Sequence, residues 1–342
     1  MDQNAEIIAR AIESSLNIIE QDREKKIISC RFGLSGHKET LEQIGDALSV
    51  TRERVRQLEK VILIRLRINA KEGKIPDLPA AEKLIVRNLT ETGRVARISD
   101  LADKIYGHKA ANAEKAGLNF LGDISSVLTV VSENDKYFLG LGIAEYGDEK
   151  LIKEKVDAIV KLIKENKSPL SLDELDAKLS YEHPSHIEAI ASLSKTLSTL
   201  NGLWGLSKWP TVNPKNIRDK IYVILENKKQ PMHFNDIAEA IANSNFKRKN
   251  VTIQAIHNEL IKDPRFVLIG RGIYALDSWG YKKGTVSEII TNVLRKAGRP
   301  LSREEIITEV LSSRKVKETT ILLNLQNKNL FKKVDKNLYE LA

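Results

Sequence analysis

The sequence predicts a mainly α-helical protein made of tandem helix-turn-helix and winged-helix modules with small β-hairpin wings. Two patterns lead to this expectation. Two helical patterns meet at a short turn near the N-terminus, and a unit of three helices and a hairpin recurs along the rest of the chain. A chain of 342 residues, 42% of them hydrophobic, is long enough for two or more domains. We expect five modules, at residues 1–74, 80–144, 150–211, 213–283 and 284–342.

The helix-turn-helix pattern occupies residues 40–67. Thr40 and Gln43 have the spacing of a capping box, so a first helix should begin at the next residue, Leu41. Ser49 interrupts this helix, and Thr51 can cap a second one. The apolar positions of the two helices should form their buried sides, and these are Leu41, Ile44, Leu48, Val55, Leu58, Ile62 and Leu66.

The opposite arc of the second helix is polar, with Arg52, Glu53, Arg56, Gln57 and Lys60. In helix-turn-helix proteins this face meets base edges in the major groove. An arginine fork can bind guanine with two hydrogen bonds, glutamine suits adenine, and glutamate can accept from cytosine. An ordinary solvated helix face is the alternative interpretation. The arginines and the glutamine that directly follow a capped turn favour DNA recognition.

The segment Arg31-Phe32-Gly33-Leu34, together with residues 40–67, resembles region 4 of the primary, sigma-70 type bacterial sigma factors. The resemblance covers about residues 24–67. It implies a module that grips the upstream promoter element and docks on the flap of the RNA polymerase β subunit. It also implies roles for individual residues: Arg52, Glu53, Arg56 and Gln57 would face the major groove, with Arg54 nearer the phosphates.

The sequence departs from this family in two features. Ser49 stands where many members have glycine in the turn, and serine tolerates a positive φ less well than glycine does. The aromatic-rich region with which sigma factors melt the downstream promoter element is not found in this sequence. We therefore expect a regulator or accessory of initiation rather than a self-sufficient sigma factor.

The net charge of +9 is distributed unevenly along the chain. Residues 24–74 have a net charge of +5, and residues 213–283 and 284–342 have +6 and +4. Residues 1–23 and 75–212 have −3 each. Basic blocks are expected where DNA phosphates are neutralised, whereas the acidic middle favours a spacer or a protein-binding surface.

Composition argues against several other classes of protein. The sequence has no apolar run of about eighteen residues and is charged from Asp2 onward, so neither a membrane span nor a signal peptide is expected. We expect a cytoplasmic, nucleoid-associated bacterial protein. The single cysteine, Cys30, excludes an internal disulfide and a cysteine-built zinc site, and it is expected to be a small buried hydrophobe.

The chain on either side of the helix-turn-helix should be helical before it and open after it. Apolar residues at helical spacing over residues 5–28 predict a helix or helix pair that packs under the second helix of the motif. Gly73, Pro76 and Pro79 mark a linker, and we place a domain boundary there.

A recurring segment then marks the second helix of each later module. It occurs at residues 168–175, 230–237 and 299–306, and a fainter copy without proline lies at 96–101. Ser171 with Glu174 and Ser302 with Glu305 have capping-box spacing, so a helix should start after each serine. Each copy leads to a third helix and then to two short β-runs, as in a winged helix. The hairpins are expected at residues 130–131 with 137–139, 200–209, 265–276 and 331–341.

The third repeat, over about residues 216–281, closely resembles a HARE-HTH domain in PMHFNDIAEAI and in the segment from Val251 to Tyr281. That winged-helix family occurs in the delta subunit of bacterial RNA polymerase and in chromatin and restriction proteins. The resemblance implies binding of DNA or sensing of its modification, without the delta subunit's acidic tail. The buried positions of its third helix would be Ile253, Ile256 and Leu260, and the candidate DNA contacts are Lys247, Arg248, Lys249, Thr252, Gln254, Asn258, Lys262 and Arg271. The basic run at 247–249 could alternatively be a solvated loop.

No enzyme motif is recognised in the sequence. A GxxxxGK phosphate loop, a GxSxG elbow and a paired-histidine helix are all absent. His183 and His186 lack a third ligand nearby, so no metal site is expected there. His233 and His257 are interpreted as structural or DNA-facing, and we expect no cofactor.

Sequence-dependent binding of double-stranded DNA in transcription, with RNA polymerase as partner, is therefore the function that the sequence favours. Two alternatives stay open. The chain could be an RNA polymerase-associated, delta-like subunit that acts through protein contacts, or a nucleoid protein without sequence preference.

Overall fold

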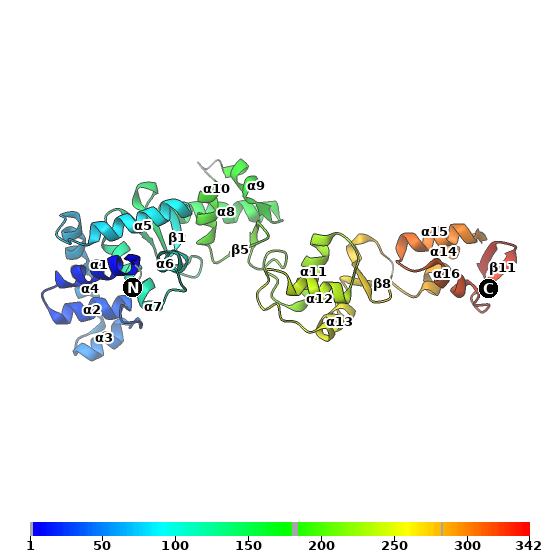
Figure 1. Cartoon of the computed structure of the whole chain (residues 1–342), viewed down its shortest axis with the longest axis horizontal. Coiled ribbons are helices and arrows are strands. Elements are labelled where there is room, and N and C mark those ends of the chain that lie inside the picture. The colour runs from blue at the N-terminus through cyan, green and yellow to red at the C-terminus, as the bar shows by residue number, and fades with distance from the viewer. Residues whose placement is uncertain (1–2, 180–183, 282) are drawn as a thin grey trace. The chain divides into compact units, whose positions relative to one another are not determined.

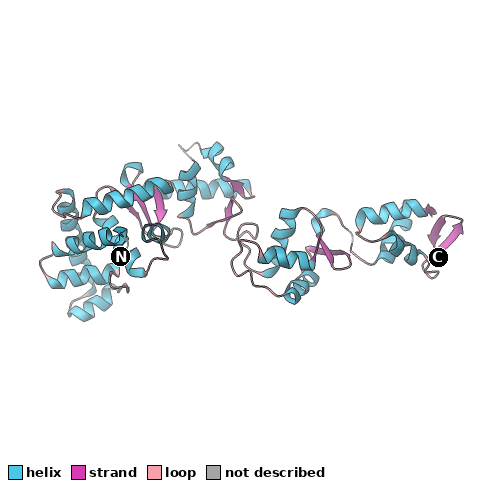
Figure 2. Cartoon of the chain, viewed as in Figure 1, coloured by secondary structure: helices cyan, strands magenta, loops and turns pink. Residues whose placement is uncertain are grey.

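The computed structural model describes residues 3–179, 184–281 and 283–342 (Figure 1). It is mainly helical with small antiparallel sheets, which confirms the predicted fold class (Figure 2). The chain forms two compact units, Met1–Lys208 and Trp209–Ala342. Within the described residues, no helix combines the length and the apolar character that a bilayer span requires.

The N-terminal helix-turn-helix has the predicted helices. They are α1 (Gln3–Asn17), α2 (Asp22–Phe32), α3 (Leu41–Leu48) and α4 (Arg52–Lys71). As predicted, α2 packs against α4, and Ile27, Ile44 and Val55 form a small buried cluster between the helices. The partly buried residues at the edge of this cluster include Cys30, Leu41, Leu48 and Leu58.

The first winged helix shares one hydrophobic core with the helix-turn-helix. Its elements are α5 (Leu78–Thr92), β1 (Val95–Arg97), α6 (Ile98–Tyr106), α7 (Asn112–Ile124), β2 (Leu128–Val131), β3 (Gly140–Ile143) and the 3-10 helix η1 (Ala144–Tyr146). Helix α1 packs on α5, α6 and α7, and α4 packs on α7. Ile8, Ile62 and Leu66 from the first segment lie in the same buried cluster as Ile85 and Phe120 from the second.

The chain between these two modules is packed into that core. We expected a linker near residues 73–79, but Ile75 and Leu78 are buried in the shared cluster. Phe32 of α2 meets Phe120 of α7 edge to face, with ring centroids 5.2 Å apart. The expected module boundary therefore separates two sequence patterns that contribute to one core.

The second winged helix belongs to the same compact unit. Its elements are α8 (Glu149–Asn166), β4 (Leu170–Ser171), α9 (Leu172–Leu179), α10 (Pro184–Ser192), β5 (Leu197–Leu200) and β6 (Leu203–Leu206). We expected residues 137–139 to form a strand of the first wing, but β3 begins one residue later. The Phe138 N–H instead donates to the Leu193 carbonyl at 2.8 Å, so this segment joins the first module to the second.

The second compact unit contains two further winged helices. The first comprises α11 (Ile217–Lys228), β7 (Met232–His233), α12 (Phe234–Ala242), α13 (Ile253–Lys262), β8 (Phe266–Gly270), β9 (Ile273–Leu276) and η2 (Asp277–Trp279). The second comprises α14 (Val286–Ala297), β10 (Leu301–Ser302), α15 (Arg303–Ser313), α16 (Glu318–Leu325), β11 (Phe331–Asp335) and β12 (Leu338–Leu341). The hairpins predicted at residues 265–276 and 331–341 are confirmed.

Each winged helix has a three-stranded sheet where the sequence predicted a two-stranded hairpin. The strand orders are β1-β3-β2, β4-β6-β5, β7-β9-β8 and β10-β12-β11. In each sheet the short strand before the second helix pairs antiparallel with the last strand, as Leu170 does with Trp204. A strand of two or three residues has no recognisable alternation, so sequence periodicity cannot reveal it.

The predicted capping boxes at the second helices are confirmed. Glu174 and Glu305 accept the backbone N–H of Ser171 and Ser302 at 2.8 and 2.7 Å. The Glu305 carboxylate also binds the Arg299 guanidinium at 2.8 Å. The Arg299 bond, with the help of the Ser302 bonds, lowers the pKa of Glu305 from 4.5 to about 2.

This ionised cap predicts an acid-sensitive helix in the C-terminal winged helix. Because the folded pKa lies below the unfolded one, the charged Glu305 stabilises the fold at pH above 4.5, and its contribution is lost as the pH falls from 4.5 towards about 2. Glu305→Gln should therefore be less stable than the wild type at neutral pH and should differ from it progressively less as the pH drops. Urea unfolding across this range measures the difference, and the exposed neighbour change Glu304→Gln is the control. A constant difference at all pH values would contradict the prediction.

Candidate nucleic-acid interface

The turn between α3 and α4 is held by caps on both sides. Thr40 Oγ1 accepts the Gln43 N–H at 3.2 Å and Gln43 Oε1 accepts the Thr40 N–H at 2.8 Å, so the predicted capping box is present. Thr51 Oγ1 accepts the Arg54 N–H at 3.2 Å and starts α4. Ser49 ends α3 with a left-handed φ of 54°.

Glycine at position 49 should suit this turn better than serine. A left-handed backbone costs an L-residue about 1–2 kcal/mol, whereas the extra freedom of glycine in the unfolded chain costs about 0.5–1 kcal/mol. We expect Ser49→Gly to stabilise the first compact unit by about 0.5–1 kcal/mol, measured as an increase in the free energy of unfolding in urea. The control Ala47→Gly lies in the regular part of α3 and should destabilise it by about 1 kcal/mol. Equal losses in both variants would contradict this account of the turn.

Gly45 and Arg23 keep the turn close to α3 and α2. A Cβ atom on Gly45 would lie 2.6 Å from the Val50 carbonyl oxygen, so a side chain there would displace the turn. The Arg23 guanidinium donates to the Leu48 carbonyl at 2.9 Å. The start of α4 is thereby placed against a supported scaffold, as a recognition helix requires.

The candidate recognition residues lie together on the exposed face of the N-terminal half of α4. Val55 on the opposite side is fully buried, and Leu58 is partly buried. Among the described residues, no neighbouring element covers the polar side chains, and all six candidates are exposed: Arg52, Glu53, Arg54, Arg56, Gln57 and Lys60. This is the side from which a duplex could approach the helix.

Glu53 joins two of these candidates in one hydrogen-bonded group. Its carboxylate accepts two bonds from the Arg56 guanidinium, at 2.9 and 2.7 Å, and a weaker one from the Gln57 amide at 3.4 Å. The Arg56 bond lowers the pKa of Glu53, and Glu53 in turn raises the pKa of Arg56. Both groups therefore stay charged at neutral pH, and a base that binds Arg56 has to compete with Glu53 or include it.

The C-terminal half of α4 serves the fold. Glu24 of α2, which is largely buried, binds Arg65 at 3.0 Å, and Asp123 of α7 binds Arg67 at 2.7 Å. Arg31, from the segment that resembles sigma factors, binds Glu59 at 3.1 Å. No local pattern in the sequence indicated these pairings. Between them, the apolar side chains Val61, Ile64 and Ile68 are exposed on the outer face of the helix.

The third helix of the HARE-like module, α13, presents a second set of candidates. Thr252 caps the helix by accepting the Ala255 N–H at 3.3 Å, and Gln254 donates to Asn258 at 3.0 Å. Ile256 and Leu260 are buried as predicted, but the prediction for Ile253 was wrong, because its side chain is 50% exposed. Ile253 is the first residue of α13, one turn before the part of the helix that enters the core. The exposed candidates here are Thr252, Gln254, Asn258, Lys262 and, on the wing, Arg271.

The basic loop before α13 is also exposed at Lys247, Arg248 and Lys249, and it is anchored from below. Lys220 of α11 is only 3% exposed, and its Nζ donates to the Arg248 carbonyl at 2.7 Å. Burial lowers the pKa of Lys220. Arg248 itself has a left-handed φ of 55°, so this bond fixes an unusual backbone conformation in the loop. The sequence analysis missed Lys220, although a lysine beside the apolar stripe of α11 was a signal.

The histidines of this module lie in a row of aromatic rings. His233 packs against Phe234, Phe234 against His257, and His257 against Tyr274, with ring centroids 4.3, 5.2 and 6.4 Å apart. His233 Nδ1 also accepts the Asn235 N–H at 3.3 Å at the start of α12. Of the other histidine pair, His183 lies outside the described residues, and His186 is part of α10.

Comparison with known proteins identifies two of the modules. The family described as Sigma-70, region 4 matches residues 21–67, and the HARE-HTH family, described as a restriction endonuclease HTH domain, matches residues 217–279. The RNA polymerase sigma factor SigA of Listeria monocytogenes is 37% identical over 73 residues, which are 21% of this chain and 19% of that protein. The chain thus spans about a fifth of the length of this curated relative.

The chain therefore contains a sigma-70 region 4 domain and a HARE-HTH domain, as the sequence motifs predicted. Both are helix-turn-helix domains, and together they indicate a DNA-binding protein with a role in transcription. The second family description also names restriction endonuclease, so this domain occurs in enzymes as well.

Proposed function

We propose that this chain is a sequence-dependent DNA-binding regulator or accessory of transcription initiation, which acts with bacterial RNA polymerase. Helix α4 would read a promoter element from the major groove. The observation that supports this proposal is the uncovered group of three arginines, a glutamate, a glutamine and a lysine at the start of α4, directly after a rigid turn.

The chemistry of this face suits base edges. Arg56 and Arg52 would bind guanine edges, Gln57 would bind adenine, and Glu53 would accept from cytosine or orient Arg56. Arg54 and Lys60 would bind phosphates. A second set of phosphate contacts would come from the HARE-HTH domain, with Lys247, Arg248 and Lys249 in its loop, Thr252, Gln254, Asn258 and Lys262 on α13, and Arg271 on its wing.

The proposal can be tested by selecting duplexes from a random pool with the full chain. We expect a short enriched motif, and binding to it should survive an excess of random competitor DNA at moderate salt. The absence of a motif, with an affinity that falls steeply with salt for every duplex, would overturn the proposal in favour of a nucleoid protein without sequence preference.

A second candidate function is protein-mediated association with RNA polymerase. The exposed Val61, Ile64 and Ile68 on the outer face of α4 favour it, because a patch of apolar side chains on one helix suits a protein contact. Purified polymerase should then retain the chain in the absence of DNA, and Val61→Glu should weaken that retention. The matched control is Val334→Glu on the wing of the last winged helix, a similarly exposed valine. Retention that both variants leave unchanged would exclude this surface.

A further inference from the structure

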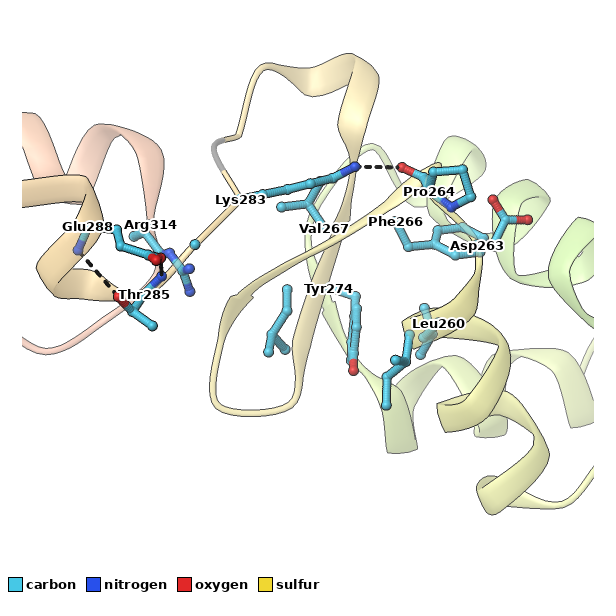
Figure 3. Close-up of a pocket in the computed structure, with 13 residues that line it drawn as sticks. Leu260, Asp263, Pro264, Phe266, Val267, Tyr274, Lys283, Thr285, Glu288 and Arg314 are labelled. Atoms are coloured by element: carbon cyan, nitrogen blue, oxygen red, sulfur yellow. Dashed lines mark hydrogen bonds between the residues drawn. The ribbon is translucent and has the colours of Figure 1, made fainter. Parts of the chain in front are cut away.

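A pocket of about 600 Å³ lies inside the second compact unit, between the wing of the HARE-HTH domain and the start of the C-terminal winged helix. Figure 3 shows Arg314 beside Thr285 and Glu288 on one wall, with Tyr274 and Leu260 on the other. This volume is in the range of pockets that hold small molecules. No proposed DNA contact lines it.

Arg314 is a charged side chain that the fold buries without a complete set of partners. It is 8% exposed, and its Nε atom has no hydrogen-bond acceptor. Among the residues that the structure describes, one oxygen of Asp176 is the other buried side-chain atom in this condition. Burial lowers the pKa of Arg314, and the nearby Glu288 offsets this only in part. A buried unpaired donor on a charged group is costly and rare, so its presence calls for an explanation.

The backbone keeps Arg314 in this position. Arg314 follows α15 in an extended conformation, and the N–H of the next residue, Lys315, donates to the Ile269 carbonyl of β8 at 3.0 Å. A Cβ atom on Gly270 would lie 2.5 Å from the Lys315 carbonyl oxygen, so the two chains touch closely. The guanidinium is therefore held at the pocket before any ligand arrives.

The other charged groups of the pocket are already engaged. Lys283 donates to the Pro264 carbonyl at 3.1 Å and lies 3.4 Å from Asp277. Asp263 binds Arg265 at 2.7 Å, and the Glu288 carboxylate accepts the Thr285 N–H at 2.6 Å. Arg314 is thus the charged lining group with an unmet bond, and the pocket requires one acceptor at that point.

The remaining wall is apolar, with the buried side chains Leu260, Phe266, Val267 and Tyr274. A guanidinium prefers an oxyanion as its acceptor, and a carboxylate matches its fork. Because Glu288 and Asp263 also line the pocket, a doubly charged phosphate would be repelled more strongly than a singly charged carboxylate.

We propose that this pocket binds a small organic monocarboxylate, with its carboxylate on Arg314 and its apolar part against Leu260, Val267 and Tyr274. The site is distinct from the DNA-binding surfaces proposed above. It joins two winged helices through Arg314 and β8, so an occupant would bridge both.

Calorimetric titration of the full chain with three probes tests the proposal. The probes are 2-naphthoate, the neutral 2-naphthylmethanol and 2-naphthyl phosphate, which share one apolar body. We expect naphthoate to bind with a 1:1 stoichiometry and at least about tenfold more tightly than either of the others. Failure of all three to bind would overturn the proposal, and tighter binding of the phosphate would overturn the choice of carboxylate.

Variants separate the pocket from non-specific adsorption. Arg314→Met should bind naphthoate at least about tenfold more weakly, whereas the control Arg295→Met, at an exposed arginine on α14, should bind as the wild type does. Leu268→Trp, at a side chain that is 46% exposed on the pocket rim, should block entry without disturbing the core. Unchanged binding in Arg314→Met or in Leu268→Trp would place the ligand elsewhere.

Thermal unfolding without ligand provides a second measurement. Arg314→Met removes an incompletely paired buried charge, so its Tm should equal or exceed that of the wild type, while stabilisation by naphthoate should be lost. A lower Tm without ligand would show that Arg314 is held for the fold alone, and the proposed site would be rejected.

Discussion

Phe120→Ala is expected to destabilise the first compact unit by about 3–5 kcal/mol, the usual cost of emptying a fully buried phenylalanine site. Phe120 is 0% exposed and belongs to α7 of the first winged helix. Its ring packs against Phe32 of α2, so the cavity would open between the winged helix and the sigma-70 region 4 domain. Urea unfolding, followed by circular dichroism, measures the loss.

The same change should weaken DNA binding by α4, although Phe120 lies on another module. Helix α4 packs against α7, and support for its exposed face passes through this core. The control is Tyr146→Ala, which removes an aromatic ring from the surface of the same unit, where the side chain is 37% exposed. If Phe120→Ala unfolded as the wild type does, the two modules would not share a cooperative core.

Arg56→Ala is expected to reduce affinity for the selected DNA motif roughly 10- to 100-fold and to change affinity for random duplex little. The guanidinium of Arg56 is exposed at the centre of the candidate face and is oriented by two bonds to Glu53. Loss of a two-bond contact to a base edge is sequence-dependent, in contrast to loss of a phosphate contact. Competition binding with the two duplexes measures both affinities.

The structure offers a closely matched control for this experiment. Arg10 is an exposed arginine that is paired with Glu6 on α1, as Arg56 is paired with Glu53 on α4. Arg10→Ala should leave both affinities unchanged. Equal losses on the motif and on random duplex in Arg56→Ala would show that α4 does not read bases.

Local chemistry made the helix-turn-helix predictable from the sequence. Capping boxes and helix caps are set by residues three apart, so Thr40, Thr51 and Ser302 marked their helices correctly. The polar arc of α4 was also predictable, since helical spacing alone places its residues on one side. The DNA contacts proposed for that arc stay predictions.

Long-range packing was what the sequence could not supply. Gly73 and Pro76 are typical of a linker, yet the neighbouring Ile75 is buried because α1, α4, α5 and α7 meet around it. The expected strand at residues 137–139 failed for a similar reason, since its backbone bonds go to a distant module. Lys220 and Arg314 were overlooked because a charged residue is assumed to be solvated, and only the fold shows that these two are buried.

The common interior of residues 3–143 has a consequence for engineering and for evolution. A graft that transfers only the sigma-like helices to another protein would carry away one half of an interlocking surface and expose Ile8, Ile62 and Leu66 to water. The smallest transferable cassette therefore extends to the end of β3, and recombination between homologous genes would preserve the protein only at crossovers beyond that strand.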